Sequence, residues 1–184
     1  PATVGGLILV SGDRYVIKYV LGLEAVAIYT YGYRFAEYVL LTLFQPFQKA
    51  FVPVILEKAA QLPLMEAADY NAKIVTSSLS LFILVVSGVL IPFKDVMLWI
   101  SNKGYDDSYL IFLLSVTGIL LYHTSQITTI LLNHLERTEL SMFMVIIGSI
   151  VNIGLNIWLI PLFGIFMAVV TTIVSYLLML WFGI

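Results

Sequence analysis

The C-terminal stretch of the chain decides the fold. It reads LSMFMVIIGSIVNIGLNIWLIPLFGIFMAVVTTIVSYLLMLWFGI from Leu140 to Ile184, and it contains no charged residue and no histidine. A helix rises 1.5 Å per residue, so about 20 apolar residues cross the roughly 30 Å hydrocarbon core of a membrane. The stretch is therefore long enough for two membrane-spanning helices, separated by a turn around Pro161 and Gly164.

The rest of the chain has the same character. Of its 184 residues, 61% are hydrophobic and only 11% are charged, whereas charged residues make up about 25% of a soluble domain. The apolar runs lack the alternation of barrel strands, so they favour helices. The sequence thus predicts an all-α membrane protein, a single transmembrane lobe over 1–184. Its six transmembrane helices are expected at about 2–21, 25–48, 74–93, 109–133, 140–160 and 163–184.

The connections give an orientation. Gly22 is typical of a tight turn after the first helix, and Pro46 and Pro53 are expected to kink or end the second. The stretch 51–73 mixes charges with Ala and Leu, which favours an amphipathic helix at the membrane surface. The positive-inside rule places the termini on the cytoplasmic side. The cations on that side are Lys49, Lys58, Lys73 and Arg137, while Lys94 and Lys103 fall on the outer side.

Several classes of function are excluded by what the sequence lacks. A net charge of −2 without a basic run gives no reason to expect a nucleic-acid partner. The chain has no cysteine, so it has no thiolate metal site. No catalytic motif occurs and the connections are too short for a catalytic domain, so we expect no enzyme activity and no cofactor. The chain opens at Pro1, and we expect it to be a piece of a longer protein.

Charged residues lie inside the first two spans, where each costs several kcal/mol unless it is paired or hydrated. The first span carries Asp13, Arg14 and Lys18, and the second carries Arg34 and Glu37. Counted from the Gly22 turn, both arginines lie roughly 13–17 Å deep, near the middle of the bilayer. The hairpin therefore predicts two ion pairs across it, Asp13 with Arg34 and Arg14 with Glu37.

The five charges leave one cation in excess, and that excess has two interpretations. A phosphate-bearing substrate in a water-filled cavity would be bound by Arg14, Lys18 and Arg34, with Asp13 and Glu37 as supporting partners. Alternatively, the group is a structural ion-pair network in which the Lys18 side chain extends to the interface. The two roles are compatible.

Polar residues elsewhere in the spans favour helix packing. Ser, Thr and Tyr recur along the fourth span and are expected to hydrogen-bond across helices. His123, in the same span, is a candidate proton-coupling site. Asn152 and Asn156, one turn apart on the fifth span, require partners on a neighbouring helix.

Two segments carry a resemblance to a known family. The first runs Asp13-Arg14-Tyr15 and then Gly22-Leu23-Glu24-Ala25-Val26-Ala27-Ile28-Tyr29; the second runs from Val151 to Ile165 and contains Asn152-Ile153-Gly154-Leu155-Asn156 and Ile160-Pro161-Leu162-Phe163-Gly164. Their order and spacing resemble the C-terminal lobe of bacterial O-antigen and exopolysaccharide flippases, within the multidrug/oligosaccharidyl-lipid/polysaccharide exporter superfamily. The chain departs from that pattern at Ala27 and at Phe166-Met167, where the family has glycine and a Gly-Ala pair.

The resemblance implies a twelve-helix exporter fold with an N-terminal lobe that is missing from this chain. The complete protein would flip a polyprenyl-diphosphate-linked oligosaccharide across the bacterial cytoplasmic (inner) membrane for polysaccharide biosynthesis. Its partners would be this lipid-linked oligosaccharide, the membrane lipids and the missing lobe, and the cations Arg14, Lys18 and Arg34 would hold the diphosphate.

Two alternatives remain at this point. A cation-coupled multidrug exporter of the same superfamily would favour acidic residues in its cavity, whereas the cluster here has a cationic surplus. A membrane-embedded glycosyltransferase or ligase would require a long catalytic loop, which the sequence does not contain.

Overall fold

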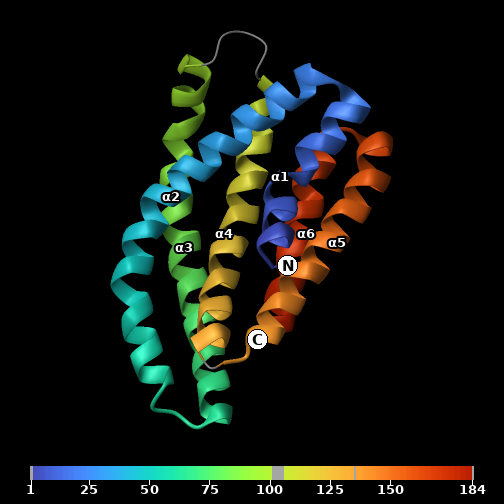
Figure 1. Ribbon diagram of the computed structural model, residues 1–184. Helices are drawn as coiled ribbons and strands as arrows, with labels where there is room; N and C mark the ends of the chain where they lie inside the picture. Colours follow the sequence, from blue (N-terminus) through green and yellow to red (C-terminus); the bar gives the residue numbers. More distant parts are fainter. Residues whose placement is uncertain (1, 101–105, 135, 184) are drawn as a thin grey trace.

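The fold is a bundle of six helices, seen in a computed structural model that describes residues 2–100, 106–134 and 136–183 (Figure 1). The described residues outside the helices form turns, so the all-α prediction is confirmed. The helices, in chain order, are α1 (Ala2–Leu21), α2 (Leu23–Ala59), α3 (Leu64–Ile100), α4 (Asp106–His134), α5 (Thr138–Phe163) and α6 (Phe166–Gly183).

Consecutive helices run in opposite directions (Figure 1). The α1–α2 and α5–α6 turns lie at one end of the bundle, together with the end of α3 and the start of α4. The α2–α3 and α4–α5 turns lie at the opposite end. Glycine closes both turns at the first end, Gly22 with φ 88° and Gly164 with φ 83°, a backbone region that side chains disfavour. Lys103 lies outside the described residues.

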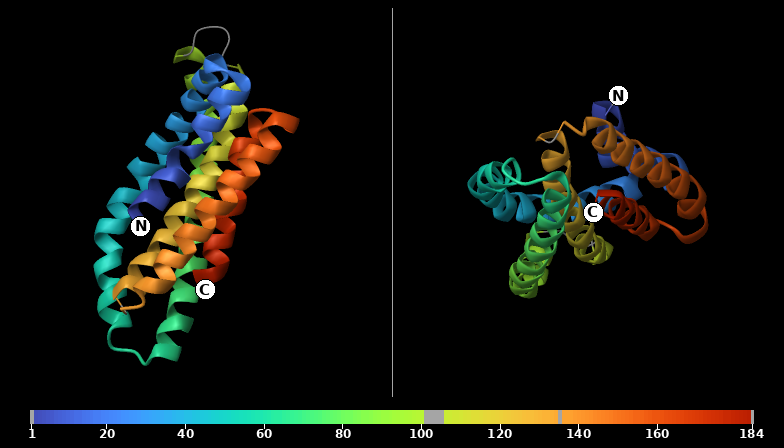
Figure 2. Two further views of the ribbon diagram at one scale, coloured as in Figure 1. Left: turned by 45° about the vertical axis from the view of Figure 1, so that its right-hand side comes forward. Right: turned by 90° about the horizontal axis from the view of Figure 1, so that it is seen from below.

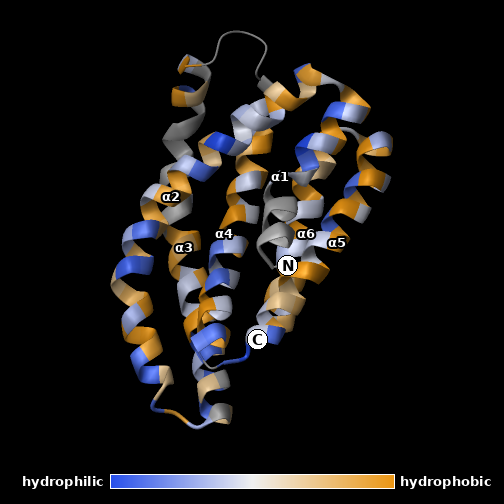
Figure 3. Cartoon of the chain, in the orientation of Figure 1, coloured by the Kyte–Doolittle hydropathy of each residue, from blue (hydrophilic) through white to orange (hydrophobic). Residues whose placement is uncertain are grey.

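Among the described residues, three helices are long and apolar enough to cross a membrane. These are α2, α5 and the Asp107–His134 part of α4. The apolar part of α6, Phe166–Phe182, is shorter, and α1 carries three charges, Asp13, Arg14 and Lys18. Figure 3 shows hydrophobic segments along the helices and a hydrophilic α4–α5 turn at one end.

Two expectations about the second and third helices are corrected by the structure. Of the two outcomes expected at Pro46 and Pro53, a kink or an end, the end is wrong: helix α2 continues through both prolines to Ala59. Residues 51–73 are not one surface helix, since they comprise the end of α2, a turn and the start of α3. Both prolines are exposed, so their rings lie away from the packed face. The burial of Leu40, Phe44 and Ile55 on the other face of α2 keeps the helix continuous.

Helix α4 forms the centre of the bundle. Seen end-on, it lies between α2 and α3 on one side and α5 and α6 on the other (Figure 2). It contacts α2, α6 and α3 extensively, while α1 packs mainly on α5. Ile111, Phe112 and Val116 of α4 are buried in the main hydrophobic core with residues of α1, α2, α3 and α6. Polar residues on α4 are therefore enclosed on most sides of the helix.

The contact between α2 and α4 is close at Gly32. A Cβ atom added there would collide with the main-chain oxygen of Ser108. The Ser108 hydroxyl in turn donates a hydrogen bond of 2.8 Å to the carbonyl of Ile28. Glycine and serine thus let the two backbones approach, as small residues do between membrane helices, and they fix the position of α2.

Candidate functional site

The site begins at Asp13, a carboxylate in the middle of α1 that is only 1% exposed. The α1–α2 hairpin brings Tyr29 to the same level, and its hydroxyl donates a hydrogen bond to Oδ2 of Asp13. The other oxygen, Oδ1, accepts the main-chain N–H of Arg14 at 2.7 Å and lies 3.6 Å from the Arg14 guanidinium. A carboxylate that is buried this deeply persists only because such donors surround it.

The Arg14 guanidinium is enclosed by aromatic rings from α2. Its Cζ lies 4.7 Å from the ring centre of Tyr33 and 5.7 Å from that of Tyr29, and only 17% of the side chain is exposed. A desolvated cation–π contact contributes about 2 kcal/mol, so Arg14 is held by packing as well as by its ion pair.

A chain of side-chain hydrogen bonds joins α5 to α6 at the same place. The Thr171 hydroxyl donates to Oδ1 of Asn156 at 2.6 Å, and the Asn156 amide donates to Oδ1 of Asn152 at 3.1 Å. The Asn152 amide donates to the Thr172 hydroxyl at 3.1 Å. All four residues are buried, and the prediction that the two asparagines need partners on a neighbouring helix is confirmed.

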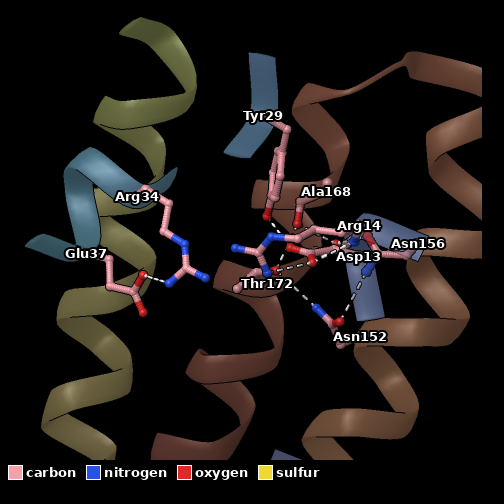
Figure 4. A network of polar contacts seen from close by, with 10 residues as sticks. Asp13, Arg14, Tyr29, Arg34, Glu37, Asn152, Asn156, Ala168 and Thr172 are labelled. Carbon is pink, nitrogen blue, oxygen red and sulfur yellow. Dashed lines mark hydrogen bonds and ion pairs between the residues drawn. The ribbon is translucent and has the colours of Figure 1, made fainter. Parts of the chain in front are cut away.

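These groups lie together as one buried polar cluster. Figure 4 shows Asp13 and Arg14 next to Asn156, with Tyr29 approaching from α2 and Ala168 and Thr172 from α6. The cluster thus joins α1, α2, α5 and α6 in the interior of the bundle. The buried polar cluster consists of Asp13, Arg14, Tyr29, Tyr33, Asn152, Asn156, Thr171 and Thr172.

A second pair of charges lies outside the cluster. On α2, the guanidinium of Arg34 is 2.5 Å from Oε2 of Glu37. The Arg34 side chain is 52% exposed and that of Glu37 is 23% exposed. In Figure 4 this exposed pair lies to one side of the buried polar cluster, and the Arg14 guanidinium points towards it. Lys18 on α1 is exposed as well, and none of the ion pairs among the described residues includes it.

The predicted pairing across the hairpin is therefore wrong. Asp13 pairs with Arg14 instead of Arg34. Arg34 pairs with Glu37, the carboxylate that was expected for Arg14. The depth was correct, because a residue of α2 does meet Asp13 at its level. The difference comes from the rotation of α2: Tyr29 and Tyr33, one turn apart, face α1, and the next residue along the helix points about 100° away from them.

His123 occupies a different part of the bundle. It is buried on α4, and its ring stacks on Phe44 of α2 with centres 4.7 Å apart. The Tyr122 ring meets it edge-on at 5.6 Å. Its Nδ1 atom has no hydrogen-bond partner among the described residues. The histidine thus packs against aromatic rings, and its role in proton coupling stays a prediction.

The exposed charges of this arrangement suit electrostatic binding. Within the described residues, no group of three His, Cys, Asp or Glu side chains could hold a metal ion. The exposed pair and Lys18 offer cationic N–H groups to a ligand, while the buried polar cluster holds the helices behind them. Sequence reasoning assigns Tyr29 and Tyr33 to the aromatic belt at the membrane surface, which is wrong because both are buried. Their spacing of four residues on a helix was a usable signal for a shared face.

Comparison with protein-family models, with curated proteins and with solved structures finds no match to this chain. The resemblance to polysaccharide flippases therefore rests on the sequence motifs alone.

Proposed function

We propose that this chain is one six-span lobe of a twelve-helix exporter that flips polyprenyl-diphosphate-linked oligosaccharides across a bacterial cytoplasmic membrane. Helices α1, α3 and α6 complete the set of spans in this proposal, because they alternate in direction with the three long apolar helices (Figure 1). The second lobe would face the exposed pair.

The observation that carries the proposal is the exposure of Arg34. Its side chain is half exposed on a helix long and apolar enough to cross a membrane. Ionised side chains inside a membrane almost always face a bundle interior or a water-filled cavity, because lipid cannot solvate them. A surface that presents Arg34 and Glu37 at this depth is thus suited to a hydrated cavity that binds an anion.

The geometry divides the cations into two groups. Arg14 is largely enclosed by Asp13 and two tyrosine rings, so in this proposal it has mainly a structural role. Arg34 and Lys18 are exposed and can reach a ligand. A guanidinium binds phosphate in a bidentate manner, so we assign the diphosphate first to Arg34. This cationic surface also disfavours the cation-coupled multidrug exporter.

Glycan export in a flippase-null strain tests the assignment. The complete protein carrying Arg34→Gln together with Lys18→Gln should reach the membrane at normal abundance and lose most export of surface polysaccharide. Arg137→Gln is the matched control, because Arg137 is an exposed arginine in the α4–α5 turn, outside the proposed cavity. Abundance is measured by immunoblot and export by staining of the surface polysaccharide.

A reversed pair separates binding from packing. In Arg34→Glu with Glu37→Arg, the ion pair and the net charge are kept, but the cation moves about one helical turn. Export should fall if position 34 holds the diphosphate and should persist if the pair only joins two turns of α2. Full export by the Arg34→Gln, Lys18→Gln variant would remove the anion-binding role from this surface.

A further inference from the structure

An apolar groove runs between α2 and α3, away from the charged groups described above. Its volume is about 250 Å³. Four residues of α2 and five of α3 form its walls, and all but the two serines and the tyrosine hydroxyl are apolar. The lining residues are Phe47, Phe51, Val54, Ile55, Tyr70, Ile74, Ser77, Ser78 and Leu81.

A polar pocket adjoins this groove at the α2–α3 turn. The two share Tyr70, and the pocket has a volume of about 420 Å³. Glu66, Asp69 and Lys73 line it, and Lys73 lies 3.2 Å from Asp69. On the α2 side, the Lys58 ammonium lies 5.1 Å from the centre of the Tyr70 ring. Cations and carboxylates therefore meet where the apolar groove ends.

The groove has the length of one membrane leaflet. Along α3, the distance from Tyr70 to Leu81 is about 16 Å at 1.5 Å per residue, which is close to half of the roughly 30 Å hydrocarbon core. The charged pocket lies at the turn end, where a membrane-spanning α2–α3 pair would meet the head groups. The apolar groove thus matches an acyl chain in length, and the charged pocket lies where the head group of the same lipid would be.

We infer that the groove and the pocket together bind one phosphatidylethanolamine molecule of the surrounding leaflet. One acyl chain lies in the groove, the phosphate lies at Lys58, and the ammonium of the head group lies at Glu66 and Asp69. This lipid site rests on the membrane placement of α2 and α3 proposed above, but not on what the protein transports.

The mixed charge of the pocket selects the head group. An anionic head group without an ammonium, such as that of phosphatidylglycerol, would meet Lys58 and Lys73 favourably, but it would also face Glu66 and Asp69 without a cation of its own. The quaternary ammonium of phosphatidylcholine has no N–H to donate. A primary ammonium donates three N–H bonds, and charge-assisted bonds to carboxylates are the stronger kind.

The absence of cysteine from the chain permits a direct test. Ser77 lines the groove and is exposed, so Ser77→Cys is labelled with a small fluorophore in the intact protein, reconstituted in phosphatidylcholine vesicles. Brominated phosphatidylethanolamine is then added at increasing mole fraction, and brominated phosphatidylcholine is added in a parallel series. We expect roughly a twofold to fivefold preference for the ethanolamine lipid at this position, the range of a few exposed ionic contacts.

Thr76→Cys provides the matched control. Thr76 is exposed at almost the same depth but points about 100° away, so its quenching should follow the mole fraction of either lipid. Glu66→Gln with Asp69→Asn should abolish the preference at position 77 without changing position 76.

Three results would overturn the inference. Equal quenching by both lipids at position 77 would reduce the groove to ordinary lipid contact. Protection of position 77 from both, with position 76 quenched, would mean that protein fills the groove. A lack of quenching at both positions would place α3 outside the membrane and would contradict the six-span arrangement as well.

Discussion

Two pairs of charges on neighbouring helices have opposite surroundings. Asp13 and Arg14 lie inside the bundle, where Tyr29, Tyr33 and the α5–α6 hydrogen bonds enclose them. Arg34 and Glu37 are closer to each other, at 2.5 Å, but half of the Arg34 side chain is exposed. Distance alone would make the second pair the stronger one, yet burial decides how much each contributes to stability.

The comparison indicates that the two sides of helix α2 have different roles, one in stability and one in binding. Helix α2 presents Tyr29 and Tyr33 to α1 and presents Arg34 to the outside, so one side of it stabilises the bundle and the other offers a cation. Removing part of the buried polar cluster should therefore destabilise the fold, whereas removing the exposed pair should mainly affect binding. Four substitutions test this division, in order of decreasing effect on stability.

Asp13→Ala should have the largest effect. It removes the carboxylate of the Arg14 ion pair and the acceptor of the Tyr29 hydroxyl, and removing one partner of a buried ion pair destabilises a protein by about 3–5 kcal/mol. Denaturation in mixed detergent micelles, followed by circular dichroism, measures the free energy of unfolding. Asp13→Asn keeps an acceptor oxygen and should lose less. Glu24→Ala, at an exposed carboxylate near the same hairpin, should change stability by no more than about 1 kcal/mol; equal losses at both positions would contradict the comparison.

Gly32→Ala should be the next in size, because it displaces the helix that carries both the tyrosines and Arg34. The new Cβ meets the main-chain oxygen of Ser108, which cannot rotate away, and overpacking of this kind destabilises by about 1–3 kcal/mol. The same denaturation assay applies. Gly154→Ala is the control, since no atom lies within 4 Å of its added Cβ. If Gly32→Ala is as stable as Gly154→Ala, the close contact between α2 and α4 does not exist.

Asn156→Ala should cost about 1–2 kcal/mol. It removes the donor to Oδ1 of Asn152, leaving that buried atom unsatisfied, and it removes one of the two acceptors of the Thr171 hydroxyl. Bonds between membrane helices contribute only modestly. Asn133→Ala, at an exposed asparagine on α4, should be neutral by comparison. Similar unfolding midpoints for the two variants would show that the α5–α6 hydrogen bonds add nothing to stability.

Arg34→Gln should have the smallest effect on stability, under about 1 kcal/mol, because exposed ion pairs contribute little. It should nevertheless reduce binding of a diphosphate-bearing lipid, measured by isothermal titration calorimetry in detergent. This combination of a small stability change and a clear binding loss is the signature of the exposed pair. A loss of stability as large as that of Asp13→Ala would show that both pairs are structural.

Much of the fold could be predicted from the sequence, because apolar runs of membrane length leave few alternatives. The helices at 109–133 and 140–160 were placed to within three residues at each end. The third was expected only over 74–93, whereas α3 runs from Leu64 to Ile100. The second was expected to be shorter, since Pro46 and Pro53 normally break helices. Packing of α2 on α4 overrides that preference here, an effect that no local sequence signal contains.

For the candidate site, the depth of each residue along its helix could be predicted, but the side of the helix that faces its neighbour could not. Counting residues from Gly22 places Asp13 opposite the correct turn of α2, because rise per residue is constant. Which residue of that turn faces Asp13 depends on the rotation of α2, and the rotation is set by Gly32 against Ser108 on a helix much later in the chain. The need of Asn152 and Asn156 for partners could be predicted, since buried amides require them.

The packing of α1 against α5 has a consequence for biosynthesis. Asp13 leaves the ribosome about 140 residues before Asn156, which corresponds to roughly 7–30 s at 5–20 residues per second. During that interval the carboxylate would enter the membrane without α5 or α6 beside it. Tyr29, only 16 residues further along, is the partner that arrives early, and it is attached through a turn closed by Gly22. Within the first hairpin, the Tyr29 hydroxyl thus stabilises the Asp13 carboxylate until α5 and α6 are synthesised. These two helices then complete its burial.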